Sequence, residues 1–149
     1  MATLRDRPYV QFNFLVDLDD GTTGTEAGFQ EVSGIGMEVT VSEYRNGNDG
    51  ENSVKKITGL NKATDVTLKR GVIGSLNLYN WLNDIRNGNQ KAFRTVTIQL
   101  QNEDHTAVVA TWKLMRARII KNVNGPFNAK GTDVAIEELT LAYERLEME

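Results

Sequence analysis

Short segments in which apolar and polar side chains alternate recur along this chain, and they constrain its fold more than any other feature. Alternation with a period of two puts the apolar side chains on one face of a β-strand, so each segment predicts a half-buried strand. We expect strands over Tyr9–Leu18, Ile35–Tyr44, Thr64–Arg70, Thr95–Gln101 and Val108–Arg118. The residues on their apolar faces are Val10, Phe12, Phe14, Val16 and Leu18; Ile35, Met37, Val39 and Val41; Val66 and Leu68; Val96, Ile98 and Leu100; and Trp112 and Leu114.

Polar segments rich in glycine, asparagine and aspartate separate these strands. Asp19–Gly28, Asn102–Thr106 and Asn124–Pro126 have the composition of turns. Arg45–Asn61 is too long for a tight hairpin loop, because most connections in compact domains run about 4–6 residues. We therefore expect Arg45–Asn61 to be a mobile or functional loop. The Gly34–Gly36 segment predicts a bulge or a bend.

One segment, Ser75–Asn87, has the pattern of an amphipathic helix. Its apolar face is formed by Leu78, Leu82 and Ile85, with Trp81 beside them. Ser75 is suited to cap the first turn, and Gly88 is suited to the left-handed conformation that ends many helices. We expect this face to pack on the sheets and both Trp81 and Trp112 to lie in the core.

The C-terminal segment Val134–Glu147 is compatible with either a helix or a strand. Its residues have good helix propensity, but Leu139, Leu141 and Tyr143 alternate as they would in a strand. We predict that residues 134–146 are mainly strand, because pairing in a sheet overrides weak local preferences. The apolar positions change phase at Glu137–Glu138, which predicts a bulge there.

Length and composition favour one domain over residues 1–149, in the form of a β-sandwich or barrel with one helix. The net charge of −3 argues against a dedicated nucleic-acid binder. The chain has no cysteine, so disulfides, thiolate metal sites and cysteine nucleophiles are excluded. No secretory signal and no membrane-spanning stretch is recognisable, so we expect cytoplasmic synthesis and no stable membrane association.

Little in the sequence indicates catalysis. The single histidine, His105, lies in a polar turn and is interpreted as a solvated hairpin tip. Asp17–Gly21 departs from the spacing of a calcium loop, and Gly71–Ser75 lacks the lysine of a phosphate loop. We predict no catalytic residue, no cofactor and no metal. The uncharged Thr/Gln face of Thr95–Gln101 is either an ordinary solvent face or a wetted wall past which other molecules slide.

Several motifs, in their order and spacing, resemble those of the inner-tube (tail-tube) proteins of contractile injection systems and contractile-tailed phages. They are Pro8–Phe14, Val32-Ser33-Gly34, Tyr44-Arg45-Asn46-Gly47, Leu68-Lys69-Arg70-Gly71, the helix core Leu78–Leu82, and Glu138–Glu144. The resemblance implies two packed antiparallel β-sheets closed as a barrel, with one flanking helix. It also implies hexameric rings that stack into a hollow tube, a surrounding contractile sheath, baseplate and cap proteins, and cargo or genome in the lumen. It leaves open whether the particle is released from the cell.

The loop Arg45–Asn61 is the expected assembly element of such a subunit. The residues that we expect at contacts between subunits are Tyr44, Arg45, Asn46, Val54, Lys55, Lys56, Ile57 and Leu60. The apolar members of this set have no obvious place to be buried except against a neighbour, and the lysines could pair with its acids. Two alternatives remain: a monomeric β-sandwich that binds carbohydrate or protein, and a small hydrolase, which the lack of a nucleophile–base pair disfavours.

Overall fold

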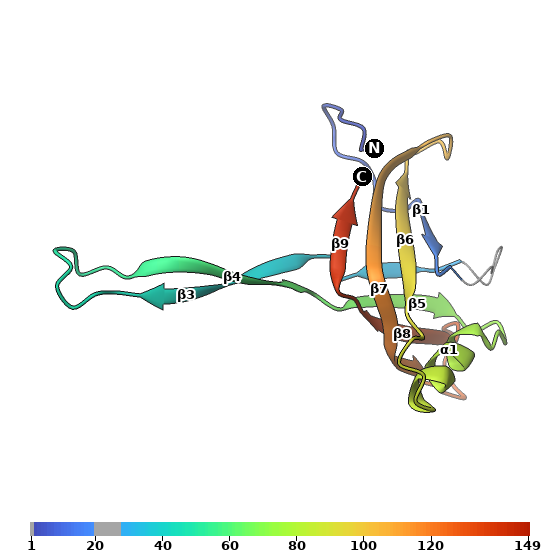
Figure 1. Cartoon of the computed structure of the whole chain (residues 1–149). Helices are drawn as coiled ribbons and strands as arrows, with labels where there is room; N and C mark the ends of the chain where they lie inside the picture. Colours follow the sequence, from blue (N-terminus) through green and yellow to red (C-terminus); the bar gives the residue numbers. More distant parts are fainter. Residues whose placement is uncertain (1, 20–27) are drawn as a thin grey trace.

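The protein is mainly β with one helix, as expected (Figure 1). The computed structural model describes residues 2–19 and 28–149. In chain order its elements are β1 (Phe14–Asp17), β2 (Glu31–Ser33), β3 (Met37–Tyr44), β4 (Lys55–Ala63), β5 (Val66–Gly71), α1 (Asn77–Arg86), β6 (Arg94–Gln101), β7 (Val108–Asn124), β8 (Ile136–Ala142) and β9 (Arg145–Met148). No helix within the described ranges is long and apolar enough to cross a membrane.

The body of the molecule consists of two antiparallel layers that share the long strand β7. In one layer β7 pairs with β6 and β9, and β6 pairs with β1. In the other layer β7 pairs with β8, which pairs with β5, which pairs with β2. Arg116 has a positive φ of 51°, and the register shifts between Ile119 and Lys121, so β7 bends where it passes from one layer to the other.

The strand pairing does not close on itself. The order β1-β6-β7-β8-β5-β2 ends at β1 and β2, which do not pair with each other in the described part of the chain. The expected closed barrel is therefore not confirmed, whereas the two antiparallel layers and the flanking helix are present (Figure 1). The layer that contains β6 has β1 and β9 as its outer strands.

The core lies between the two layers and under the helix. The predicted apolar faces of β5, β6 and the C-terminal segment are confirmed, because Val66, Leu68, Val96, Leu139 and Leu141 are all at most 1% exposed. Trp81 is fully buried and Trp112 packs against the core from its margin. The core cluster consists of Val16, Leu18, Val66, Leu68, Leu78, Trp81, Val96, Ile98, Leu114, Ala117, Ile119, Leu139, Leu141 and Tyr143.

The first strand is shorter than its alternation predicts. Only Phe14–Asp17 pairs with β6, and the preceding residues form an irregular segment. Phe12, expected on the apolar face, is 66% exposed, whereas Asn13 is buried. The side-chain amide of Asn13 donates to the carbonyls of Asn102 and Glu103 in the distant β6–β7 turn, so these hydrogen bonds outweigh the apolar alternation here.

The C-terminal segment is strand, as predicted, but the predicted bulge at Glu137–Glu138 is wrong. The pairing of β8 with β5 runs without a shift through both glutamates. Glu137 instead occupies an inward position, where its carboxylate accepts a hydrogen bond from Arg70 Nε at 2.6 Å. Both side chains are at least nine-tenths buried. The change of apolar phase therefore marks a buried ion pair rather than an extra residue.

The helix is confirmed, but its start is not. α1 begins at Asn77 with Leu76 as its N-cap and no side-chain cap, whereas Ser75 had been expected to cap it. The Ser75 hydroxyl instead donates to the side-chain oxygen of Asn77, which also accepts from Arg70. At the other end, Gly88 has the expected positive φ of 94°.

The apolar face of α1 packs on the sheets, with Leu78 and Trp81 fully buried and Leu82 and Ile85 partly buried. Because Leu82 is only partly buried, we expect Leu82→Ala to lower the free energy of unfolding by about 1–2 kcal/mol, less than the about 2–5 kcal/mol of a fully buried leucine. Chemical denaturation measures this change. Tyr79→Ala, on the exposed face, is the matched control and should change stability by less than about 0.5 kcal/mol. An equally small loss for Leu82→Ala would contradict the helix packing.

Candidate assembly surface

The hairpin formed by β3 and β4, here called the arm, projects from the body as an isolated two-stranded ribbon (Figure 1). Every residue of β3 is exposed, and so is every residue of β4 except Ala63. The alternation had predicted that Met37, Val39 and Val41 lie on a half-buried strand, and this is wrong. No second layer covers either face of the arm within the described structure.

The base of the arm explains why it leaves the body. Gly34 has a φ of 89°, and a Cβ atom there would lie 2.4 Å from the carbonyl oxygen of Asp65, so the bend requires glycine. The hydroxyl of Thr64 donates to the carbonyl of Gly34 at 2.6 Å. The Tyr143 hydroxyl donates to the carbonyl of Gly36 at 2.9 Å. These contacts fix the chain direction at the bend that the sequence predicted.

The predicted loop Arg45–Asn61 is shorter in the structure. Residues 45–54 form the turn of the hairpin, and the remainder belongs to β4. The alternation does not predict this strand because Gly59 and a bulge interrupt it. The three residues Val39–Val41 of β3 oppose the four residues Thr58–Asn61 of β4. A side chain at Gly59 would contact the Thr40 hydroxyl at 2.7 Å.

Two of the predicted contact residues hold the turn together. The guanidinium of Arg45 donates to the carbonyls of Glu51 and Asp49 and to the side chain of Asn52. The Asn46 side chain accepts from the Tyr44 hydroxyl at 2.5 Å, and its backbone N–H donates to the carboxylate of Asp49. Arg45 and Asn46 therefore have a structural role within the arm, whatever else they contact.

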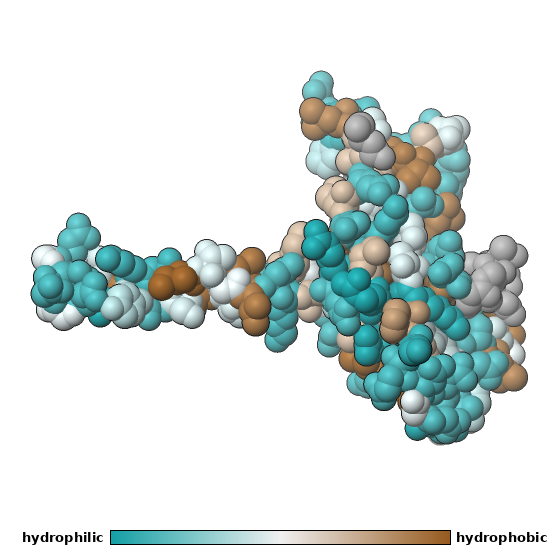
Figure 2. Space-filling model, viewed as in Figure 1, coloured by the Kyte–Doolittle hydropathy of each residue, from teal (hydrophilic) through white to brown (hydrophobic). Residues whose placement is uncertain are grey.

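The other predicted contact residues present apolar and cationic groups to solvent. Leu60 is 83% exposed, and Ile57 and Tyr44 are each more than half exposed. Lys56 lies opposite Glu43 in the register and Lys62 lies opposite Glu38, so the arm carries acidic partners for both lysines. Figure 2 shows exposed apolar groups along the arm. The large exposed apolar residues of the arm are Met37, Val39, Val41, Tyr44, Val54, Ile57 and Leu60.

An isolated two-stranded hairpin is at best marginally stable in water. The arm has no core of its own, and its apolar side chains lie on both faces of the ribbon. Exposed apolar groups of this density mark an interaction surface. We expect the arm to be covered by protein in the functional state.

A groove of about 660 Å³ opens on the body beside β1. Apolar side chains from both layers line it, together with Gln11, Gln30 and Glu31, which are exposed. The groove lies where the layers fail to close, between the outer strands β1 and β2. Its lining residues are Tyr9, Val10, Gln11, Phe12, Phe14, Gln30, Glu31, Val32, Ile35, Ile98, Leu100 and Trp112.

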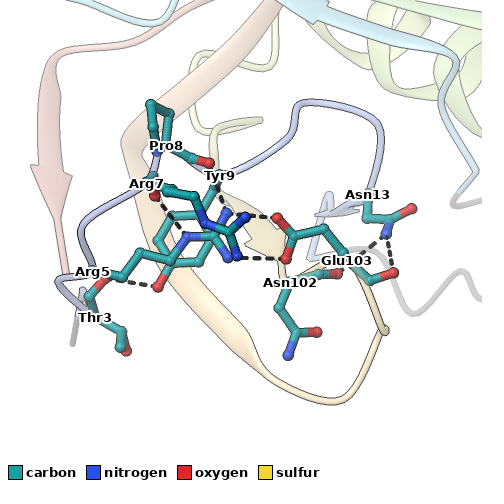
Figure 3. Close-up of polar contacts among 8 residues, drawn as sticks. All are labelled: Thr3, Arg5, Arg7, Pro8, Tyr9, Asn13, Asn102 and Glu103. Atoms are coloured by element: carbon teal, nitrogen blue, oxygen red, sulfur yellow. Dashed lines mark hydrogen bonds and ion pairs between the residues drawn. The ribbon is translucent and has the colours of Figure 1, made fainter.

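Residues 3–13, here called the strap, form one wall of the groove and are fastened to the β6–β7 turn (Figure 3). The Arg5 guanidinium donates two parallel hydrogen bonds to the Glu103 carboxylate, at 3.0 and 2.5 Å. It also donates to the carbonyls of Arg7 and Pro8 and lies 3.8 Å from the centre of the Tyr9 ring. This bidentate ion pair fixes the strap geometrically.

The Arg5 hydrogen bond, with a smaller contribution from a backbone N–H, lowers the pKa of Glu103 from 4.5 to about 2. A carboxyl with a lowered folded-state pKa stabilises the fold above its ordinary pKa, and this contribution is lost as the pH falls through the folded value. We therefore expect the ion pair to hold the strap above about pH 4.5 and to be lost as the pH falls through about 2, which detaches the strap from Glu103. NMR shifts of residues 3–12 would measure it. Glu103→Gln should show, already at neutral pH, the chemical shifts that the natural protein shows at low pH. A change of these shifts with a midpoint near pH 4.5 would contradict the role of the Arg5–Glu103 ion pair.

The candidate catalytic and metal residues do not form a site. His105 is exposed in the β6–β7 turn with a φ of 59°, and its ring contacts Gln101. No group of three or more acidic or histidine side chains able to hold a metal occurs in residues 2–19 and 28–149. Of the predicted acidic turn Asp17–Gly21, Asp20 and Gly21 lie outside the described residues.

His105→Ala is expected to change the free energy of unfolding by less than about 0.5 kcal/mol, because the side chain is exposed and contacts one polar neighbour. Chemical denaturation together with electron microscopy of the variant tests this. The hydrolase alternative requires a base, so a variant that folds normally but has lost its function would revive it.

Comparison with known proteins agrees with this surface-based description. The chain is similar to a chain in the structure of an extracellular contractile injection system, the PVC sheath-tube complex in its extended state, at 30% identity and a TM-score of 0.82, covering 95% of this chain and 91% of that one. It is also similar to the cap of the anti-feeding prophage, described as the AFP tube terminating cap, at 25% identity, a TM-score of 0.84 and coverage of 100% and 95%.

A structure of Hcp1 from Flavobacterium johnsoniae shares the fold alone, at 11% identity and a TM-score of 0.55, covering 91% of this chain and 93% of that one. No curated protein matches the chain. The family described as T4-like virus tail tube protein gp19 matches residues 10–147, which is nearly the whole sequence. The chain therefore belongs to the T4-like tail tube protein family, whose members are structural tube proteins of phage-tail-like particles and not enzymes.

Proposed function

We propose that this protein forms hexameric rings, which stack into the hollow inner tube of a contractile injection apparatus and serve as a conduit for cargo or genome. The observation that carries the proposal is the arm: an uncovered two-stranded ribbon with exposed apolar side chains on both faces, in a member of the tail tube family. A subunit of this kind is incomplete without copies of itself.

The outer strands of the β6 layer supply a means to close a ring. Among residues 2–19 and 28–149, β1 and β9 each pair along one backbone edge only, and each strand is four residues long. Free strand edges pair readily with another chain. Pairing β9 of one subunit with β1 of the next is a head-to-tail contact, which closes into a ring when the rotation between subunits permits. Six such layers would together form one continuous wall and close the sheet that remains open in a single subunit.

The uncharged outer face of β6 fits the inner surface of that wall. Val96 and Ile98 are buried against the core, so the alternating residues Thr95, Thr97 and Gln99 face the other way. Such a surface has hydroxyl and amide groups that water satisfies, and it has no charges that would bind a passing molecule tightly. This supports the wetted-wall interpretation of the Thr/Gln face.

The partners in this proposal are other copies of the chain, a contractile sheath protein, and baseplate and cap proteins, with translocated cargo in the lumen. Solved assemblies of similar proteins include a sheath-tube complex and a tube cap, which supports these partners. The chain would act as one tail-tube domain over residues 1–149, with the arm turn as its assembly loop. Synthesis and assembly in the cytoplasm, within a particle that can be released, complete the proposal.

Negative-stain electron microscopy of the purified protein, with and without the neighbouring particle components, tests this function. Rings or tubes with a central hole are expected. Featureless monomers under all conditions would overturn the proposal in favour of a monomeric binding module.

A substitution at the β9 edge tests ring closure itself. The backbone groups of Glu149 and Thr111 bond to each other reciprocally, so the alternation of an antiparallel pair turns the N–H of Met148 away from β7 and toward the free edge. Met148→Pro removes this N–H while leaving the bonds to β7 in place, so it should abolish rings. Met148→Ala, the matched control, should retain them. Rings formed by the proline variant would show that β9 does not pair between subunits.

A further inference from the structure

We propose that the groove beside β1 is the socket for the arm of a neighbouring copy of this chain, an inference that rests on the proposed function and names the contact that joins its subunits. The arm and the groove are the two uncovered apolar features described above, and each lacks what the other supplies. The arm has apolar side chains without a core, and the groove has an apolar interior without a lid.

The interior of the groove matches a strand ribbon better than a small polar ligand. Phe14, Val32, Ile98 and Trp112 form its walls, and they come from β1, β2, β6 and β7. Binding sites for small molecules combine an apolar lining with a few converging polar groups. Here Gln11, Gln30 and Glu31 are exposed to solvent, and the carboxylate of Glu31 already lies 3.5 Å from the Lys69 ammonium. Shape and apolar area therefore dominate this site.

The strands that border the groove also offer hydrogen bonds. In the described part of the chain, β2 pairs only with β5 and β1 pairs only with β6, so each strand has a second edge without a partner there. An arm laid between them could add a strand to either edge while inserting its side chains between the layers. Leu60, the most exposed large apolar side chain of β4, and Ile57 are the expected inserts.

The positions of arm and groove on the body suit a head-to-tail contact. The outer strands of the β6 layer are β9 on one side and β1 on the other. The arm extends from the β9 side of the body, where β4 contacts β9 (Figure 1). The groove is lined by β1 and the strap, on the other side of this layer. When β9 of one subunit pairs with β1 of the next, the arm of the first subunit points across the groove of the second.

The strap keeps the socket open before the arm arrives. Tyr9, Val10 and Phe12 line the groove, and the Arg5–Glu103 ion pair holds this segment in place. Phe12 is 66% exposed at the groove, so it is available to contact an inserted side chain. A preorganised wall lowers the conformational entropy that docking would otherwise cost.

Cross-linking tests the contact directly, because the natural chain has no cysteine. The variant Leu60→Cys/Phe12→Cys, assembled and treated with a short bifunctional maleimide, should give a ladder of covalent oligomers that extends beyond dimers. Leu60→Cys alone should give dimers at most, since a ladder needs two different reactive positions. Leu60→Cys/Tyr79→Cys is the matched control, with the second thiol on the exposed face of α1, and should give no ladder.

The outcomes separate the inference from the proposed function. Tubes that form without a Leu60–Phe12 ladder would overturn the socket and leave the tube function intact. Absence of rings and tubes from the natural protein would overturn both.

Hydrogen exchange of the natural protein gives a readout that needs no substitution. Assembly should slow exchange of the amides of residues 9–14 and 30–32 together with those of residues 57–62. If the assembled and unassembled fractions exchange equally at the groove, the arm docks elsewhere. A small apolar ligand in the groove would likewise show itself as protection of the groove that persists in a variant lacking the arm.

Discussion

A variant in which Glu38–Lys62 is replaced by an Asn-Gly turn is expected to fold and to form no rings or tubes. None of the core residues lies in the removed segment, so the body should keep its thermal stability. Asn-Gly is the preferred two-residue hairpin connection, and Met37 and Ala63, which pair with each other, remain to carry it. Thermal unfolding by circular dichroism and electron microscopy of the same sample measure the two expectations separately.

A smaller change distinguishes the side chains of the arm from its backbone. Ile57→Ser/Leu60→Ser keeps the hairpin but removes two exposed apolar groups, and it should also prevent assembly. Thr58→Ser/Lys62→Ser alters the same strand to the same extent and should assemble normally. Tubes built by the shortened chain would contradict the role of the arm, and failure of the shortened chain to fold would assign the arm to the core.

Glu137→Leu is expected to lower the free energy of unfolding by about 3–5 kcal/mol, because it removes a carboxylate that forms a buried ion pair with Arg70. Arg70 is 1% exposed, and its guanidinium bonds to Glu137 and to Asn77 at the start of α1. The ion pair therefore joins β5, β8 and the helix. Chemical denaturation monitored by tryptophan fluorescence measures the loss.

The double variant Arg70→Met/Glu137→Leu is the control for this prediction. It replaces both charges with apolar groups of similar size, and replacing a buried ion pair in this way is often neutral or stabilising. We expect it to recover most of the stability that Glu137→Leu loses. A cost below about 1 kcal/mol for Glu137→Leu alone would mean that water or another group satisfies Arg70.

The sequence predicted those elements whose formation depends on local periodicity. The alternation of Val66/Leu68 and Val96/Ile98 and the helical stripe around Trp81 each identified buried faces correctly. A strand or helix that buries one face in a single core can be predicted from its own residues, because its apolar residues repeat with the period of the strand or helix. The order and spacing of the tail-tube motifs also predicted the family.

Other features had a visible signal whose physical cause the sequence did not reveal. The pattern of apolar positions changes phase at Glu137. Such a change is compatible with a bulge and equally with a buried charge. The difference depends on Arg70, which lies 67 residues away in the chain. Similarly, Asn13 stands in a polar position of the alternation but is buried, because its hydrogen-bond acceptors belong to the β6–β7 turn.

Tertiary structure alone decided what covers each strand. Met37, Val39 and Val41 alternate like core residues, yet they lie on an arm that leaves the body at Gly34. Alternation indicates that one face of a strand is buried against other apolar side chains. It does not indicate whether those side chains belong to the same chain or to another copy. The missed part of β4, the open edges at β1 and β9 and the groove all depend on pairing between distant segments. The sequence therefore determined the strands and the helix, while long-range pairing determined which surfaces remain for assembly.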